Sequence, residues 1–176
     1  MTTYSLAVRE SEDAPNHDKL QVALIILRND ELDKPLRVSS DNKNRLSVKP
    51  LVYGTKSTWQ TEREDGGPED FLFIAMMATV PDDPDSGLPS ASITIIDGDG
   101  SIRKKLRNAR GEVTVDMAVV MADDPNTLLD FWLGMRLSDA TGQGSFLTFE
   151  IGAYPVLEEL YGCVRMTRDR CPALFE

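Results

Sequence analysis

The chain has 176 residues, of which 41% are hydrophobic, and this is enough for one ordinary domain whose core needs neither metals nor disulfides. A formal net charge of -10 at pH 7 argues against general attraction to nucleic-acid phosphates or to an anionic membrane surface. No run approaches the roughly 18 apolar residues of a membrane span, and the N-terminus lacks a signal-peptide pattern. We therefore expect a soluble protein made in the cytoplasm.

Residues 1–19 are predicted to be an N-terminal arm, because a short alternating piece is followed by a polar run that contains Pro15. The domain is expected over residues 20–162, and residues 163–176 form a C-terminal arm. The domain opens with QVALIILRN, in which both alternating sets of positions are apolar. This pattern predicts a strand that is buried on both faces, or against a neighbouring subunit.

The next segments are predicted from their turn residues. Pro35 makes residues 32–38 an edge strand or the start of a strand, and the following SSDNKN is a turn region. Further strands are expected over residues 46–53 and 71–80, separated by the polar loop TEREDGGPED. A Pro- and Asp-rich turn at residues 81–89 then leads into a strand over residues 90–96, which should pair antiparallel with the strand before the turn.

The clearest alternation of the chain covers residues 112–122. Val113, Val115 and Met117 lie on its core face, whereas Asp116 and Ala118 lie on a face that should be at least partly exposed to solvent. After a turn at residues 123–126, the run FWLGMRL has apolar residues at every second position, which favours a strand over a helix.

A turn at residues 141–144 then leads into a strand over residues 146–151, and helical spacing predicts a short helix over residues 156–161. The fold class is therefore mainly β (α+β). We predict a β-sandwich or barrel of about seven or eight strands with two short helices.

The stretch ITIIDGDGSIRKKLR, residues 93–107, resembles a calcium-binding loop at first sight. The residues at the sixth and twelfth ligand positions do not fit in either register: one register places Leu106 at the twelfth position, and the other places Ile102 at the sixth. A turn between a strand and a helix explains the residues better, because the glycines permit positive φ and Asp99 or Ser101 can cap the helix.

That predicted helix carries the one concentrated positive patch of the acidic chain, formed by Arg103, Lys104, Lys105, Arg107 and Arg110. The simple interpretation is a solvated helix face. The alternative is docking onto an acidic patch of a neighbouring subunit, with Asp82, Asp83 and Asp85 as the partners. Contact with nucleic acid is the third interpretation, and the overall charge opposes it.

Enzymatic chemistry has little support in the residues. His17 is the only histidine and lies in the N-terminal arm, and no phosphate-binding glycine loop of the GxxxxGK type occurs. The two cysteines, Cys163 and Cys171, have the wrong spacing for a standard zinc pair, so free thiols are expected. No cofactor or metal is predicted.

Four segments together resemble a family of tailed-bacteriophage minor tail and tail-tip proteins, catalogued as a domain of unknown function. These segments are LRNDELDKPLRVSSDN, VPDDPDSGLPSASITIIDGDGSIRKKLRNA, VTVDMAVVMADDPNTLLD and YPVLEELYGCVRMTRDRCPALF, within residues 27–175. The resemblance implies a non-enzymatic structural subunit of the virion, at the distal end of the tail. Three or six copies would form a ring between the tail tube and the hub or receptor-binding assembly.

Under this interpretation the functional parts are interfaces, and DNA passes an acidic channel without specific binding. The predicted interface residues are those of the basic helix, the three aspartates of the acidic turn, and Arg165, Arg168, Arg170 and Phe175 in the C-terminal arm.

Two other classes of function remain open from the sequence. A carbohydrate- or receptor-binding β-sandwich would need an exposed aromatic platform, for which Trp59, Tyr53, Trp132 and Tyr154 are the available residues. A hydrolase with a carboxylate pair would need a spacing that no pair in the sequence singles out.

Overall fold

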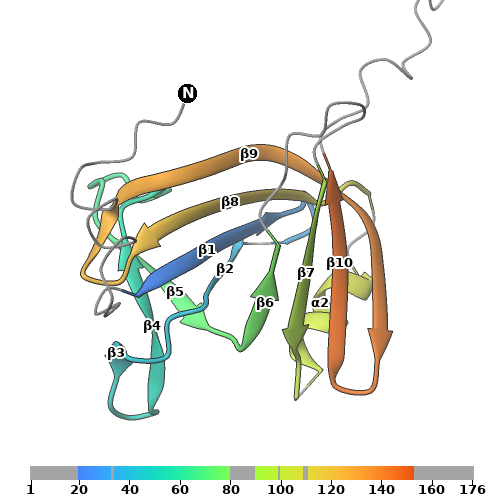
Figure 1. The fold of residues 1–176 in the computed structure, drawn as a ribbon, viewed down its shortest axis with the longest axis horizontal. Helices are drawn as coiled ribbons and strands as arrows, with labels where there is room; N and C mark the ends of the chain where they lie inside the picture. Colours follow the sequence, from blue (N-terminus) through green and yellow to red (C-terminus); the bar gives the residue numbers. More distant parts are fainter. Residues whose placement is uncertain (1–19, 33, 80–89, 99, 109–110, 153–176) are drawn as a thin grey trace, which may run out of the picture.

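In the computed structural model of the chain, the described residues are 20–32, 34–79, 90–98, 100–108 and 111–152. They form ten strands and one short helix (Figure 1). The elements are β1 Gln21–Arg28, β2 Leu36–Ser39, β3 Arg45–Ser47, β4 Val52–Ser57, β5 Glu69–Phe73, β6 Met76–Ala78, β7 Ser90–Ile96, α2 Ser101–Asn108, β8 Thr114–Met121, β9 Asp124–Gln143 and β10 Phe146–Gly152. The mainly β class that the sequence predicts is confirmed.

All ten strands belong to one mixed sheet with the order β3-β4-β5-β2-β1-β8-β9-β10-β7-β6. The sheet is not closed, since β3 lies at one edge and β6 at the other. The prediction of a sandwich or barrel of seven or eight strands is therefore wrong in both architecture and count. The parallel pair β2–β5 is what makes the sheet mixed, and it joins the edge group β3-β4-β5 to the rest.

The additional strands arise because two predicted strands are each divided. Residues 46–53 contain a turn at residues 48–51 around Pro50, which separates β3 from β4. Residues 71–80 change neighbours at Ile74 and Ala75: the Ile74 N–H donates to the Ser39 carbonyl, whereas the Ala75 carbonyl accepts from Ile96 N–H, each at 2.9 Å. As a result β5 pairs with β2 and β4, and β6 pairs antiparallel with β7. The predicted pairing of this region with residues 90–96 is confirmed for β6.

Strand β1 is buried on both faces, as the sequence predicts. It pairs with β2 on one side and with β8 on the other, so its burial is satisfied within the chain and requires no neighbouring subunit. β2 begins directly after Pro35, which confirms the predicted strand start. The edge position is wrong, because β2 lies between β5 and β1.

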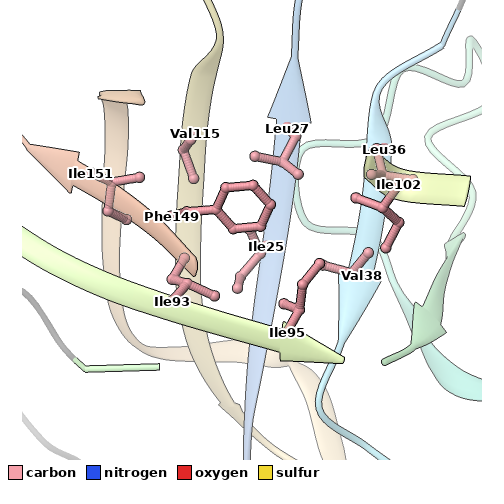
Figure 2. Close-up of a pocket in the computed structure, with 10 residues that line it drawn as sticks. All are labelled: Ile25, Leu27, Leu36, Val38, Ile93, Ile95, Ile102, Val115, Phe149 and Ile151. Carbon is pink, nitrogen blue, oxygen red and sulfur yellow. The ribbon is translucent and has the colours of Figure 1, made fainter. Parts of the chain in front are cut away.

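The larger core cluster lies on the inner face of the sheet, which we define as the face that carries Ile25 of β1, Met117 of β8 and Phe149 of β10. Figure 2 shows ten apolar side chains from β1, β2, β7, β8, β10 and α2 around one point of this core. The space between them is only about 10 Å³, no more than one water molecule needs, and its lining is apolar. This cavity is a packing gap of the core rather than a ligand site.

A second, smaller core cluster lies on the opposite, outer face. It contains Leu24 and Ile26 of β1 and Val120 of β8, and it is covered by Trp59 and Phe71. The two aromatic rings stack with their centroids 6.2 Å apart. Burial on this side corrects the prediction for residues 112–122, because Asp116 and Ala118 are buried rather than partly exposed.

The long strand β9 carries the sheet from one half to the other. Its first part pairs with β8 and its last part pairs with β10, and Figure 1 shows it arching over the molecule. Gly134, at φ 64°, lies in β9 at the irregular part of the β8 pairing. The predicted choice of a strand for this segment is confirmed, as is the antiparallel pair that it forms with residues 146–151.

Several predictions lie outside the described residues, namely the two arms, the turn at residues 81–89 and the helix over residues 156–161. Of the two predicted helices, α2 is therefore the one that the structure describes. Among the residues that are described, no helix has the length and apolar composition that crossing a membrane requires.

Candidate functional site

Helix α2, the predicted basic helix, is held on the end of the inner core by its apolar side. Ile102 is buried in the larger core cluster, and Leu106, one turn further along, packs against it. The basic residues Lys104, Lys105 and Arg107 lie at other positions of the helix and are exposed. The packing of Ile102 and Leu106 therefore fixes the position of a helix that exposes three positive charges.

Asp97 terminates β7 and holds the first turn of α2. Its buried carboxylate accepts hydrogen bonds from the N–H groups of Ile102 at 3.3 Å and Arg103 at 2.9 Å. These are two of the amides that the start of a helix leaves without intrahelical partners, and the negative charge lies at the positive end of the helix dipole. The predicted strand-turn-helix is confirmed, and Asp97 supplies a cap that the sequence did not single out. Asp99 lies outside the described residues.

The contacts of Asp97 also explain why residues 93–107, which resemble a calcium-binding loop, carry an acidic residue at this position. Both oxygens of Asp97 are used by the helix amides, so the carboxylate has a structural role without a metal ion. Among the described residues, no group of three or more potential metal ligands comes together.

Arg103 differs from the other basic residues of the helix. Its Nη2 donates to the carbonyls of Gly144 at 2.8 Å and Phe146 at 3.3 Å, so the side chain ties α2 to the β9–β10 turn. Because it is half-buried, Arg103 does not belong to the exposed patch that the sequence predicts. Arg110 lies outside the described residues, and so do Asp82, Asp83, Asp85, Arg165, Arg168, Arg170 and Phe175.

Lys105 also lines an open groove of about 1100 Å³ between α2 and the β2–β5 part of the sheet. The charged side chains of this groove are balanced: four are basic, namely Lys34, Arg37, Arg63 and Lys105, and four are acidic, namely Glu31, Glu62, Glu69 and Asp70. A balanced lining gives the groove no marked preference for an anion or a cation. Its walls are a mixture of these charged side chains and apolar ones such as Leu36, Pro68 and Leu72, and the groove is wide and open, which suits a protein surface better than a small molecule.

The buried member of the groove lining is Arg37, on the outer face of β2. Its Nε donates to Glu69 Oε2 at 3.0 Å, its Nη2 donates to the Gln60 carbonyl at 3.1 Å, and the guanidinium lies 5.7 Å from the centre of the Phe71 ring. Desolvation works to raise the pKa of Glu69, but the N–H of Glu62 and the charge of Arg37 outweigh it, and the pKa lies below its usual value. These contacts fasten the 58–68 loop over the outer core.

A second ion pair, between the half-buried Arg28 and the buried Asp116, was not predicted from the sequence. Asp116, in the middle of β8, accepts from the guanidinium of Arg28 and from the N–H of Gly134 at 2.6 Å. Arg28 also donates to the side chain of Gln60, so one network joins β1, β8, β9 and the 58–68 loop. The sequence contained one signal for this pair, namely the charged Asp116 within the mostly apolar strand β8. It did not indicate that Arg28 is the partner.

The described members of the predicted aromatic platform are buried or half-buried. Trp59 is buried against Phe71, and Trp132 packs against the inner core. Tyr53 is half-buried on β4, and Tyr154 lies outside the described residues. The geometry therefore brings no set of aromatic rings together for stacking on a sugar.

No protein-family model matches this sequence, and a search of curated proteins also gives no match.

Proposed function

We propose that the chain is a non-enzymatic structural subunit of a bacteriophage tail tip, and that three or six copies form a closed ring between the tail tube and the hub or receptor-binding assembly. The proposal starts from four segments of the chain that resemble tail-tip proteins. These segments are distributed over residues 27–175. One of these segments contains the Asp97 turn and helix α2.

One observation carries the proposal: α2, which is packed on the inner core, exposes Lys104, Lys105 and Arg107 on a chain of net charge -10. A ring of identical subunits needs two different and complementary patches on each copy, so that the head of one contacts the tail of the next. A compact positive patch on an acidic protein meets this requirement, because it orients the approach of an acidic surface and disfavours other orientations.

The acidic partner in this proposal is the segment Asp82, Asp83 and Asp85 of the neighbouring copy. The C-terminal residues Arg165, Arg168, Arg170 and Phe175 extend the contacts to the neighbouring copies or to the tube and hub. The acidic surface that remains would allow DNA to pass along the channel without being bound.

A carbohydrate- or receptor-binding module of the virion is the second candidate. It ranks lower because Trp59 is buried against Phe71 and Trp132 packs on the inner core, so neither ring is available for an exposed platform.

The proposal is tested by reversing the charge of the exposed helix face in the double variant Lys104→Glu, Arg107→Glu. The matched control is Lys43→Glu, Lys49→Glu, which changes the net charge by the same amount at two exposed positions away from α2. Both proteins are supplied in trans to a phage that lacks its own copy, and the chain in purified particles is quantified by mass spectrometry. We expect incorporation of the helix variant to fall at least tenfold while the control stays near wild type. Equal incorporation of the two variants would contradict the proposed contact and would mean that the basic residues of α2 only face solvent.

A further inference from the structure

The outer face of the sheet carries an uncovered apolar patch on its second half, which we call the outer apolar patch. It consists of Met77 of β6, Ile96 of β7 and Phe146 of β10, whose side chains are 79%, 49% and 55% exposed. Ile96 and Phe146 are direct cross-strand partners, and Met77 pairs with Thr94, two residues before Ile96 on the same face. Three large apolar side chains on adjacent strands mark a contact surface more strongly than isolated ones do.

The polar groups inside this area are already satisfied. Thr94 and Thr148 are cross-strand partners next to the patch, and their hydroxyls lie 3.1 Å apart in a hydrogen bond. On the opposite face of the same strands, Ile93, Ile95 and Phe149 are buried in the inner core.

The chain itself supplies a suitable cover. Residues 153–176 follow directly after Gly152, the last residue of β10, which is the strand that carries Phe146. They contain Val156, Leu157, Leu160 and Tyr161 at a spacing that would place them on one side of a helix. A segment joined to the edge of its own binding surface has an effective concentration in the millimolar range, which a separate molecule does not have.

The reach of this segment is sufficient. Phe146 lies six residues before Gly152, so the patch extends about 20 Å back along β10 at the rise of a strand. The 24 residues from 153 to 176 would span about 36 Å even if all of them were helical, at about 1.5 Å each. Met77, on the row of Thr148, lies about 13 Å back along the strand direction and two strand spacings of about 4.8 Å across, which places it about 16 Å from Gly152 and well within this span.

We propose that residues 153–176 of the same chain pack on the outer apolar patch. This inference rests on the exposed side chains and the point of attachment, and it is independent of the proposed role in a phage tail. In consequence, the C-terminal arm starts from a fixed place on the β7–β10 part of the sheet.

The test uses the two natural cysteines, Cys163 and Cys171, which both lie in this segment and are the only ones in the chain. Met77→Cys introduces a third thiol at the most exposed residue of the patch. The control is Val48→Cys, a similarly exposed position in the β3–β4 turn at the other edge of the sheet. Under mild oxidation of the full chain, we expect Met77→Cys to form a disulfide with Cys163 or Cys171 within one molecule, at least tenfold faster than Val48→Cys does. Peptide mapping and non-reducing gels identify the bond.

Two outcomes would overturn the proposal. Equal rates for the two variants would mean that the segment does not lie on the patch, and disulfides between molecules would assign the patch to a second copy. A second measurement avoids the new thiol: Ile96→Lys should increase the reaction rate of the natural thiols with a soluble disulfide reagent several-fold. Leu133→Lys, equally exposed on β9, should leave that rate unchanged. Equal rates in these two variants would also contradict the proposal.

Discussion

The outer face of the sheet has two halves that differ in what covers them. Over β1 and β8 the cover comes from Trp59, Phe71 and the 58–68 loop, which is fastened by the Arg28–Asp116 and Arg37–Glu69 pairs. Over β6, β7 and β10 the corresponding face exposes Met77, Ile96 and Phe146. β7 and β10 are similar in length to β1 and β8, whereas β6 has three residues and lies at the edge of the sheet. The two halves therefore differ in one strand and in the segments that pack on them.

The covered half contains the contacts that hold the domain together, whereas the open half leaves its apolar side chains available for other contacts. In the covered half, apolar burial is combined with buried charges that each have a partner, an arrangement that is costly to disturb. In the open half, half-exposed apolar side chains contribute little to the folding of the sheet and are free to bind a further segment.

The largest expected effect comes from truncating the cover itself. Phe71→Ala removes a fully buried ring that stacks on Trp59, and we expect the free energy of unfolding to fall by about 3–5 kcal/mol. Phe146→Ala in the open half should lower it by about 1 kcal/mol or less, because that ring is already half-exposed. Urea denaturation of both variants provides the measurement. Equal losses would show that the two halves are covered to the same degree.

The second largest loss of stability is expected from breaking the Arg28–Asp116 ion pair of the covered half. Asp116→Ala leaves the Arg28 guanidinium and the Gly134 N–H without their buried acceptor, and we expect a loss of about 3 kcal/mol. The comparison variant is Asp70→Ala, whose exposed pair with Lys56 spans 3.9 Å and should contribute at most about 0.5 kcal/mol. Asp116→Asn keeps an acceptor for Gly134 and should recover part of the loss. An unchanged free energy of unfolding in Asp116→Ala would show that this network does not stabilise the covered half.

The smallest effect concerns the pH dependence of the loop. The pKa of Glu69 is lowered in the folded protein, so its stabilisation is fully present above the unfolded value of 4.5 and is lost as the pH falls through the folded pKa. Glu69→Gln should therefore be less stable than wild type near neutral pH, by less than about 1 kcal/mol, and the difference should shrink as the pH falls below 4.5. Urea midpoints across this pH range measure it, and a difference that stays constant with pH would assign the effect to something other than the charge.

The strands were predictable where a single face or both faces are continuously apolar. The alternation in β8 and β10 and the two-sided run of β1 predicted these strands, and Gly134 correctly favoured a strand for β9. The number of strands and the open sheet were not predictable, because they depend on where residues 71–80 change neighbours and on the parallel pairing of β2 with β5. Those choices are made by long-range contacts, which leave no periodic signal in the sequence.

The candidate site was predictable in part. The spacing of Ile102 and Leu106 predicted a helix with its basic residues outward, and Lys104, Lys105 and Arg107 are exposed as expected. The role of Arg103 was hidden, because its partners are backbone carbonyls more than 40 residues away in the sequence. The Arg28–Asp116 pair was hidden for the same reason, since its partners are separated by 88 positions.

A reconstruction of intact phage particles produced from a genome that encodes this chain tests the proposed function most directly. We expect a closed ring of three or six copies between the tail tube and the hub, with the exposed face of α2, including Lys104 and Arg107, against the neighbouring copy. A ring in which α2 faces solvent, or particles that lack the chain, would contradict the proposal.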